Sequence, residues 1–459
     1  MAELRLDELA QKMGGKILQG SPSLRFDRFN IDSRQSKPGE LFFAITAERD
    51  GHNYISHSVQ KGAAGAVISH KIPLQNQKTA LIQVKDTVQA LQLLAKKILQ
   101  ESNSKVIGIT GSVGKTTVKE FTATLVTNNR HILKSERNYN NYLGLPLSLL
   151  RLTKEDELAV LEYGMSCSGE ITALTHIAPP DIAVITNIKP VHLKFFKDIK
   201  NIALAKKEIL DGMKSKGTAV LNGDDSLVKE IAGKRKGKQL FFGTSTGHDI
   251  SAENIRKDGW KGTTFDLNYG REKIKIFIPF FCKSSIYNFL AAAGVAYALS
   301  IPAQKIADQA KHLTSFSNRG GLVHLKNNIK LIDDSYNSNP AALEMALKDL
   351  AELPGNRKIA ILGDMLELGE NENEFHIKAG KKAAQLGLDL LVTIGPLSLN
   401  MAKGAIASGM KTSRIFSYQD SGKAAIEIKT FLREGDVILV KGSRGIKTEK
   451  IINGLKGKG

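Results

Sequence analysis

The segment GITGSVGKTT at 108–117 has the residue types of a phosphate-binding loop. Glycines let backbone N–H groups approach phosphate oxygens, and the first turn of a following helix adds partial positive charge. Lys115 can reach the β- and γ-phosphates of a nucleotide, and the Thr116 hydroxyl can bind Mg²⁺. The nucleotide-binding residues predicted here are Gly111, Ser112, Val113, Gly114, Lys115, Thr116 and Thr117.

This loop departs from the common GxxxxGK[ST] spacing, because Ile109 stands where that pattern has its first glycine. Its context supports the interpretation all the same. The apolar run VIGIT at 106–110 precedes the loop, and a helix-like stretch, Val118–Val126, follows it. A GKT sequence between a strand and a helix is much stronger evidence than a GKT sequence alone.

Glu162 is a candidate metal ligand. It follows the apolar run LAVL at 158–161, and a carboxylate at the carboxyl end of a parallel strand lies beside the phosphate loop. Carboxylate and hydroxyl oxygens suit Mg²⁺, so Glu162 and Thr116 are predicted to bind it from the same side. The alternative is a surface or helix-capping glutamate.

Two series of apolar runs indicate the sheets that must position these residues. The first lies at 106–110, 158–164, 182–188 and 218–222, and the second at 329–335, 358–364, 388–395 and 436–443. Apolar runs without alternation, separated by helix-like stretches, favour parallel strands covered on both faces. We predict an α/β chain with a central P-loop, doubly wound parallel-sheet ATPase domain and a C-terminal Rossmann-like domain.

The region before residue 85 has a different pattern. Its apolar runs, such as LFFAIT at 41–46 and GAVIS at 65–69, are short and lie among turn residues. This indicates a small mixed α/β N-terminal domain, followed by a helix at 88–99 that leads into the central part. The predicted domains are 1–84, 85–314 and 315–459, which agrees with roughly 150 residues per domain.

Composition and charge limit the class of protein. The chain is 42% hydrophobic and 24% charged, no apolar run approaches the roughly 18 residues that span a bilayer, and the amphipathic start is unlike a signal peptide. We therefore expect a cytoplasmic protein without a membrane partner. Cys167 and Cys282 do not make a disulfide framework, and a small buried side chain is the favoured role of Cys167.

The formal net charge of +19 favours anionic partners, such as a nucleotide and a UDP-linked substrate. Nucleic acid is not expected as a partner. The densest basic cluster, at 234–238, carries no interleaved aromatic residues on which bases could stack.

The loop TGSVGKTT resembles that of the Mur ligases and of their folylpolyglutamate synthetase relatives. The resemblance continues in order through most of the chain. It comprises NYNNYLGLPLSLL at 138–150, LEYGMSCSGEI at 161–171, ITNIKPVHL at 185–193, AKKEI at 205–209, LNGDD at 221–225, NRG at 318–320, DDSYNSNP at 333–340 and KGSR at 441–444. A chance phosphate loop would not be accompanied by this series.

Within the family, the chain is most similar to the type that adds D-alanyl-D-alanine. The features are IDSRQSKPGELFFAI and RDGHNYI near the N-terminus, YGMSCSGEI, DDSYNSNP, and ILGDMLELGE at 361–370. The type that adds a diamino acid tends to carry a YAHTP-like motif, where this chain reads YNSNP at 336–340. The resemblance implies ATP-dependent ligation of D-alanyl-D-alanine to UDP-N-acetylmuramoyl-tripeptide through an acyl phosphate, releasing ADP and phosphate, in peptidoglycan synthesis.

The resemblance also implies roles for individual residues, with ATP and Mg²⁺ as cofactors and a monomer as the expected state. His192 would contact a second Mg²⁺, and Lys206 would be carbamylated by CO₂. Arg319 would offer a cationic fork to phosphate, and Asp334 would orient the ribose or Arg319. The implied catalytic residues are Lys115, His192, Lys206, Arg319 and Asp334.

Asn288 is implied to approach the adenine, but the Gly-x-His that usually precedes it is replaced by residues 282–285, CKSS. This departure puts the adenine contact in doubt. The implied substrate-binding residues are Asp32, Ser33, Arg34, Asp50, Gly51, His52, Asn140, Asn141, Tyr336, Asn337, Lys441, Ser443 and Arg444.

Two alternatives stay open from the sequence. One is another amino-acid ligase of the Mur family, or a folylpolyglutamate-synthetase-like ligase. The other is a protein of a different class, which binds a nucleotide for regulation and performs no ligation.

Overall fold

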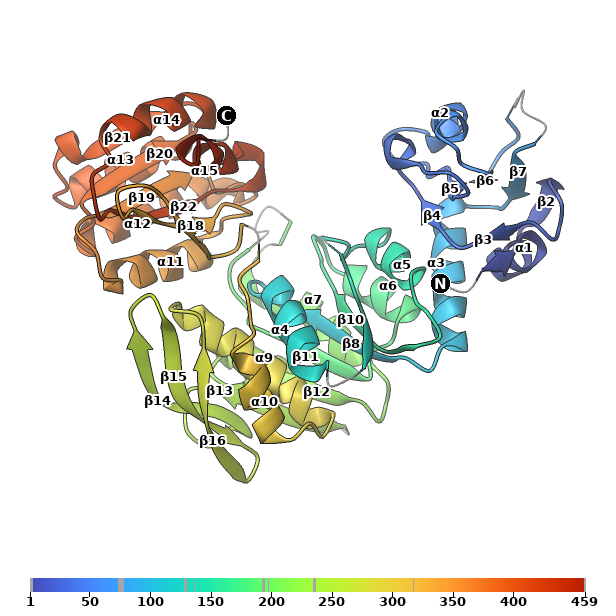
Figure 1. Ribbon diagram of the computed structural model, residues 1–459, viewed down its shortest axis with the longest axis horizontal. Helices are drawn as coiled ribbons and strands as arrows, with labels where there is room; N and C mark the ends of the chain where they lie inside the picture. The colour runs from blue at the N-terminus through green and yellow to red at the C-terminus, as the bar shows by residue number, and fades with distance from the viewer. Residues whose placement is uncertain are drawn as a thin grey trace.

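The chain forms three α/β parts, each built on its own main sheet, and the central part lies between the other two (Figure 1). The computed structural model describes residues 3–72, 78–127, 130–136, 138–191, 195–196, 198–233, 237–316 and 318–457. His192 and residues 234–236 of the basic cluster lie outside these ranges. No helix in the described ranges combines the length and apolar character needed to cross a membrane.

The N-terminal part contains a small mixed sheet, as the short apolar runs predicted. Its strand order is β2-β7-β6-β5-β4, in which β2 pairs antiparallel with β7 and the other neighbours run parallel. The strands are β1 (Leu4–Arg5), β2 (Lys16–Gln19), β3 (Arg25–Phe26), β4 (Phe29–Asn30), β5 (Leu41–Phe43), β6 (Gly65–Ile68) and β7 (Ala80–Gln83). The helices are α1 (Leu6–Met13) and α2 (Ile55–Gln60), with short 3₁₀ turns η1 (Ser33–Gln35) and η2 (Gly51–Tyr54).

The central part has a largely parallel sheet of order β16-β15-β14-β13-β12-β11-β8-β10-β9. Its parallel strands are β8 (Lys105–Thr110), β9 (His131–Lys134), β10 (Asp156–Glu162), β11 (Ile182–Ile185), β12 (Thr218–Asn222) and β13 (Lys238–Gly243). Its helices are α3 (Thr87–Glu101), α4 (Lys115–Val126), α5 (Gly144–Leu149), α6 (Glu170–Ile177), α7 (Ile199–Asp211), α8 (Ser226–Ala232), α9 (Lys283–Ala298) and α10 (Ala303–Ala310). The predicted doubly wound sheet is confirmed.

One edge of the central sheet was not predicted. The strands β14 (Ile250–Asp258), β15 (Gly262–Tyr269) and β16 (Glu272–Ile278) form an antiparallel meander beyond β13. Their polar and apolar residues alternate, since one face packs on the core while the other meets solvent. Continuous apolar runs indicate strands that are buried on both faces, so they did not predict these three strands.

The C-terminal part has the Rossmann-like arrangement that was predicted, with strand order β17-β18-β22-β19-β20-β21. Only β17 pairs antiparallel among its described strands. The strands are β17 (Gly321–His324), β18 (Lys330–Asp334), β19 (Lys358–Gly363), β20 (Leu390–Ile394), β21 (Ile415–Tyr418) and β22 (Val437–Lys441). The helices are α11 (Pro340–Glu352), α12 (Glu372–Gln385), α13 (Leu399–Ala407), α14 (Ser421–Glu427) and α15 (Glu449–Leu455), with 3₁₀ turns η3 (Gly369–Asn371), η4 (Thr412–Arg414), η5 (Ile428–Thr430) and η6 (Arg444–Ile446).

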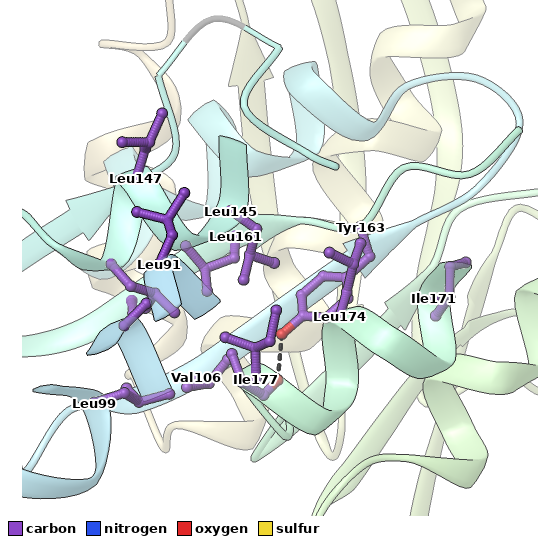
Figure 2. Close-up of a cluster of buried hydrophobic side chains, with 14 of the residues drawn as sticks. Leu91, Leu99, Val106, Leu145, Leu147, Leu161, Tyr163, Ile171, Leu174 and Ile177 are labelled. Atoms are coloured by element: carbon purple, nitrogen blue, oxygen red, sulfur yellow. Dashed lines mark hydrogen bonds between the residues drawn. The ribbon is translucent and has the colours of Figure 1, made fainter. Parts of the chain in front are cut away.

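Helix α3 joins the N-terminal and central parts. Asp86 caps its first turn by accepting hydrogen bonds from the N–H groups of Val88 (2.7 Å) and Gln89 (2.9 Å). Its buried face packs on α1 at one end, and on α5 and α6 of the central part. Figure 2 shows Leu91 and Leu99 of this helix among buried side chains of the central part, with the Tyr163 hydroxyl donating to the Ala178 carbonyl nearby.

The turn between β14 and β15 contacts the C-terminal part. The Trp260 indole N–H donates to the Pro354 carbonyl at 2.9 Å. The Lys257 ammonium lies 2.5 Å from a Glu352 carboxylate oxygen and 3.6 Å from one of Asp349. An aromatic anchor and an ion pair therefore fix the end of α11 against the central part.

Replacing Leu91 by Ala should lower the free energy of unfolding by about 2–5 kcal/mol, because a fully buried leucine leaves a cavity when it is truncated. Leu93 on the same helix is exposed, so Leu93→Ala is the matched control and should change stability by less than about 1 kcal/mol. Urea unfolding followed by circular dichroism measures both. Equal effects of the two substitutions would contradict the packing described for α3.

Candidate functional site

A large cleft of about 1270 Å³ lies where the carboxyl ends of the central strands face the C-terminal part. The phosphate loop and the ends of β10, β11 and β12 form one wall. The loops that follow β18, β19 and β22 form the other wall, and the start of α9 closes one side. Ligands of open parallel sheets bind at this edge, so the cleft is the candidate active site.

The phosphate loop has a backbone that only glycine can adopt at two positions. Gly111 and Gly114 have φ values of +147° and +90°, which favour glycine. A Cβ on Gly111 would lie 1.9 Å from the Thr186 hydroxyl oxygen, and one on Gly114 would lie 2.4 Å from the Asn288 amide oxygen. The loop therefore packs closely between the end of β11 and the start of α9, with no room for a larger residue at these two positions.

Residues that follow β11 hold the loop in shape. The Thr186 hydroxyl donates to the Val113 carbonyl at 2.6 Å, and the Asn187 side chain exchanges two 3.0 Å hydrogen bonds with the backbone of Val113. The Ser112 hydroxyl bonds the Lys189 backbone in both directions, at 2.9 and 3.0 Å. These contacts fix the backbone of the loop against the residues that follow β11.

Lys115 lies at the first position of α4, with its ammonium 2.7 Å from the Gly111 carbonyl oxygen inside the loop. Burial lowers the pKa of Lys115; the Glu162 carboxylate opposes this effect and the Arg319 guanidinium adds to it. Arg319 belongs to the opposite wall, so charged residues of both walls influence the pKa of Lys115.

Glu162 ends β10 and is only 2% exposed. Its Oε1 accepts no hydrogen bond from the described residues, although the Lys119 ammonium lies 3.3 Å away. A buried carboxylate oxygen that lacks a hydrogen-bond donor and lines the cleft together with Thr116 fits a hard cation such as Mg²⁺. The donor set therefore agrees with the metal-binding role predicted for Glu162 and Thr116.

Lys119 is a residue that sequence reasoning missed. This lysine is fully buried on α4, where its ammonium donates to the Ser135 carbonyl at 2.6 Å and lies 3.1 Å from Glu120. It thus neutralises part of the buried charge of Glu162. Its position one helical turn after Lys115, on the same face, was the signal that could have found it.

Lys206 lies on α7 and is buried, whereas its neighbour Lys207 is on the surface and pairs with Asp211 at 2.6 Å. Burial lowers the pKa of Lys206 well below its ordinary value, and the charge of Lys115 adds to this effect. Lys206 therefore stands close enough to the phosphate loop to sense Lys115, although it does not line the cleft. The position of His192 lies outside the described residues.

Arg319, Lys441 and Arg444 are among the charged residues of the C-terminal wall. The Lys441 ammonium is 3% exposed and contacts Asp334 Oδ2 at 2.5 Å and the Asn337 carbonyl at 3.0 Å. The guanidinium of Arg319 stacks on the Tyr336 ring at 4.0 Å. Asp334 thus pairs with Lys441, a partner that the sequence did not indicate.

The predicted asparagines line the same cleft in different ways. The Asn141 side chain accepts hydrogen bonds from the N–H groups of Leu143 (3.2 Å) and Gly144 (2.8 Å), so it shapes the start of α5. Asn140 lies against Gly164, whose N–H donates to the Asn140 carbonyl at 2.8 Å. Asn288 lies against the phosphate loop at Gly114.

The predicted residues of the N-terminal part do not line this cleft. Asp32 accepts from the backbone N–H of Arg34 at 3.1 Å and from its guanidinium at 2.8 Å, and these hydrogen bonds lower the pKa of Asp32. The arginine side chain stays largely exposed, whereas Ser33 is buried. Any substrate that contacts both regions must therefore span the space between two parts of the molecule.

Asp50, Gly51 and His52 form a hydrogen-bonded turn at η2. Ligand atoms of Asp50, His52 and His70 lie within 4.8 Å of one another. Both ring nitrogens of His52 are engaged, however, Nδ1 with Asp50 at 2.6 Å and Nε2 with the N–H of Ser69 at 2.9 Å. His52 thus orders the backbone of the turn, and the cluster carries no metal assignment.

Asp224 forms a second polar cluster on the cleft wall, which the LNGDD motif marked without suggesting a role. Its carboxylate accepts from the Thr244 N–H at 2.6 Å, the Tyr287 hydroxyl at 2.8 Å and His248 Nε2 at 2.9 Å. Burial raises the pKa of Tyr287 to about 12. This network joins the loops after β12 and β13 to the start of α9.

The prediction for Cys167 was wrong, because its side chain is exposed. It lies in the turn before α6, where its N–H donates to Glu170 Oε2 at 3.1 Å. Partial desolvation raises the pKa of this exposed thiol and the charge of Glu170 adds to the effect, which disfavours the thiolate.

Comparisons with known proteins agree with this architecture. Family models described as "Mur ligase middle domain" and "Mur ligase, glutamate ligase domain" match residues 109–296 and 318–444. The chain is 34% identical over 426 residues to the UDP-N-acetylmuramoyl-tripeptide–D-alanyl-D-alanine ligase of Bacillus subtilis, covering 92% of each protein.

Solved structures extend the likeness to the fold. A crystal structure of MurF from Acinetobacter baumannii matches with a TM-score of 0.90 and 28% identity, covering 100% of both chains. MurF from Thermotoga maritima, solved in complex with ADP, matches with a TM-score of 0.82 and 29% identity, covering 94% of this chain and 97% of that one. Since the similarity runs through almost the whole length in sequence and in fold, the chain belongs to the Mur ligase family.

Proposed function

We propose that this chain catalyses the ATP-dependent ligation of D-alanyl-D-alanine to UDP-N-acetylmuramoyl-tripeptide in peptidoglycan synthesis, with release of ADP and phosphate. The observation that carries the proposal is one continuous cleft in which the phosphate loop and Glu162 face Arg319 and Lys441. The full-length similarity to ligases with this activity supports the same reaction.

Each part of the chain has a task in this proposal. Residues 1–84 bind the UDP-linked substrate, residues 85–314 bind ATP, and residues 315–459 bring the dipeptide. Because Arg34 and its neighbours lie away from the cleft, the substrate has to extend from the N-terminal part, and closure of the parts would shorten that path. The proposal includes a cytoplasmic location and a monomer.

The reaction needs an activated acyl group. The terminal carboxylate of the tripeptide attacks the γ-phosphorus of ATP, and ADP leaves. The dipeptide amine then attacks the resulting acyl phosphate, and the tetrahedral intermediate collapses to an amide with loss of inorganic phosphate. Both steps require positioning and neutralisation of developing negative charge, with no protein nucleophile.

The chain's own residues meet these requirements. Lys115 and the backbone N–H groups at the N-terminus of α4 hold the phosphates of ATP. Arg319, fixed on the Tyr336 ring, presents a guanidinium to the transferring phosphoryl group from the other wall. Asp334 holds Lys441 in place. Asn288 lies against Gly114 of the phosphate loop and is assigned to the adenine by family resemblance.

Mg²⁺ is the metal that this reaction implies. Glu162, whose Oε1 accepts no hydrogen bond from the described residues, and Thr116 would hold it, and His192 is assigned to a second ion by family resemblance. When bound, the metal would neutralise phosphate charge.

Lys206 is proposed to carry a carbamate. An amine must be neutral to react with CO₂, and burial lowers the pKa of Lys206 well below its ordinary value. The resulting carbamate would place a negative charge near Lys115, which suits a site rich in cations.

Lys115→Ala should reduce ligation by at least roughly 100-fold, because a cation aimed at the phosphates is lost. The measurement is phosphate release with UDP-muramoyl tripeptide, with and without D-alanyl-D-alanine. Lys207→Ala, which removes an exposed lysine on α7, is the control and should retain activity. A fully active Lys115→Ala variant would refute the phosphate-loop assignment.

The same assay separates the alternatives. Phosphate release that needs a single amino acid in place of the dipeptide would indicate another ligase of the family. Nucleotide binding without acceptor-dependent phosphate release would indicate a regulatory binding protein.

Carbamylation of Lys206 predicts a dependence on CO₂. Wild-type protein in ¹³C-bicarbonate at neutral pH should show one protected carbamate signal by NMR, which Lys206→Ala removes and Lys207→Ala keeps. Acidification should abolish the signal, since protonated amine does not react with CO₂. Retention of the signal in Lys206→Ala would contradict the assignment.

A further inference from the structure

The motif ILGDMLELGE, which distinguishes the chain within its family, forms a loop between β19 and η3 that lines the C-terminal wall of the cleft. Its beginning is fixed by buried polar contacts. Asp364 accepts from the N–H of Ser398 at 2.6 Å, and the Met365 N–H donates to His376 Nε2 at 3.0 Å. His376 in turn donates from Nδ1 to the Glu372 carbonyl at 2.6 Å.

The loop buries two apolar side chains and presents a third. Met365 and Leu368 are buried in the core of the C-terminal part, whereas Leu366 between them is 40% exposed. Leu366, Glu367 and Leu368 all line the cleft. Glu367 follows with φ +64°, a conformation that a glutamate keeps only where its surroundings impose it. The anchors on either side therefore hold the Leu366 side chain in the cleft.

Leu366 is also tied to the loop after β22. Its N–H donates to the Ser443 hydroxyl at 2.9 Å, and a Cβ on Gly445 would lie 3.1 Å from Leu366 Cδ1. Arg444, between those two residues, lines the same cleft with a side chain that is 66% exposed, and its guanidinium lies 3.5 Å from Glu449 Oε1. An apolar side chain and a guanidinium thus stand together on one wall.

We propose that Leu366 determines specificity for the C-terminal residue of the acceptor dipeptide: its side chain contacts the D-alanine methyl group while Arg444 binds the carboxylate. The inference rests on the proposed function and names the subsite within it. The methyl and carboxylate groups branch from the same carbon atom, so an apolar surface beside a cation complements both. The amine, at the other end of the dipeptide, is left to reach the acyl phosphate.

The test compares Leu366→Ala with Leu399→Ala. Leu399 belongs to the same part, is 45% exposed and does not line the cleft, so it matches Leu366 in residue type and in approximate exposure. The acceptors are D-Ala-D-Ala, D-Ala-D-Leu and D-Leu-D-Ala, each assayed by acceptor-dependent phosphate release. Leu366→Ala should raise kcat/KM for D-Ala-D-Leu relative to D-Ala-D-Ala by at least roughly tenfold, because room for a larger side chain has opened. The ratio of D-Leu-D-Ala to D-Ala-D-Ala should stay at its wild-type value, and Leu399→Ala should change neither ratio.

A second variant tests the opposite change. Leu366→Phe should shift preference from D-Ala-D-Ala toward D-Ala-Gly, since the added ring takes the space of the methyl group. The inference would be overturned if both Leu366 variants kept the wild-type ratios, or if only the ratio for D-Leu-D-Ala changed. In either case, ligation of D-Ala-D-Ala by the wild-type protein would still uphold the proposed function. A wild-type protein that ligates no dipeptide would overturn both.

Discussion

The parallel pairing of β8 with β10 on one side and β11 on the other is the constraint on which the site depends. The register sets Ile109 beside Glu162 and Thr110 beside Ile185. Because parallel strands end at the same edge of a sheet, the phosphate loop, the buried carboxylate and the Thr186–Asn187 pair emerge together. A slip of one residue between these strands would turn Glu162 to the other face.

The same edge explains the distribution of charge in the cleft. Lys115 and Glu162 lie on the central wall, and Lys119 compensates Glu162 from beneath, where water does not reach. On the other wall Asp334 compensates Lys441, Arg444 lies 3.5 Å from Glu449, and the Arg319 guanidinium stacks on the Tyr336 ring. A buried charge is tolerated when it is paired, so each wall keeps its internal charges balanced and directs the remaining ones into the cleft.

The position of the C-terminal part depends on contacts far from the chemistry. The β14–β15 turn binds the end of α11 through Trp260 and Lys257, and Figure 1 shows this meander reaching toward the C-terminal part while the N-terminal part lies at the opposite end of the molecule. The junction combines these polar contacts with apolar packing, because Trp260 and Phe281 pack on the core of the C-terminal part. The central and C-terminal parts each have their own sheet and core, and the contacts between them set the position of the two walls of the cleft.

The sequence by itself determined the α/β class, the phosphate loop, the metal-binding candidate Glu162 and the family. These predictions follow from local patterns, because apolar runs, glycines and a GKT sequence indicate local structure whatever the rest of the chain does. It did not reveal the role of Lys119, the Asp334–Lys441 pair, the meander β14–β16 or the exposure of Cys167. Those depend on residues far apart in the chain, and only tertiary packing decided which lysine is buried against which carboxylate. Leu366 is the clearest case: its motif was visible in the sequence, but its place in the cleft results from Met365 and Leu368 being buried on either side of it.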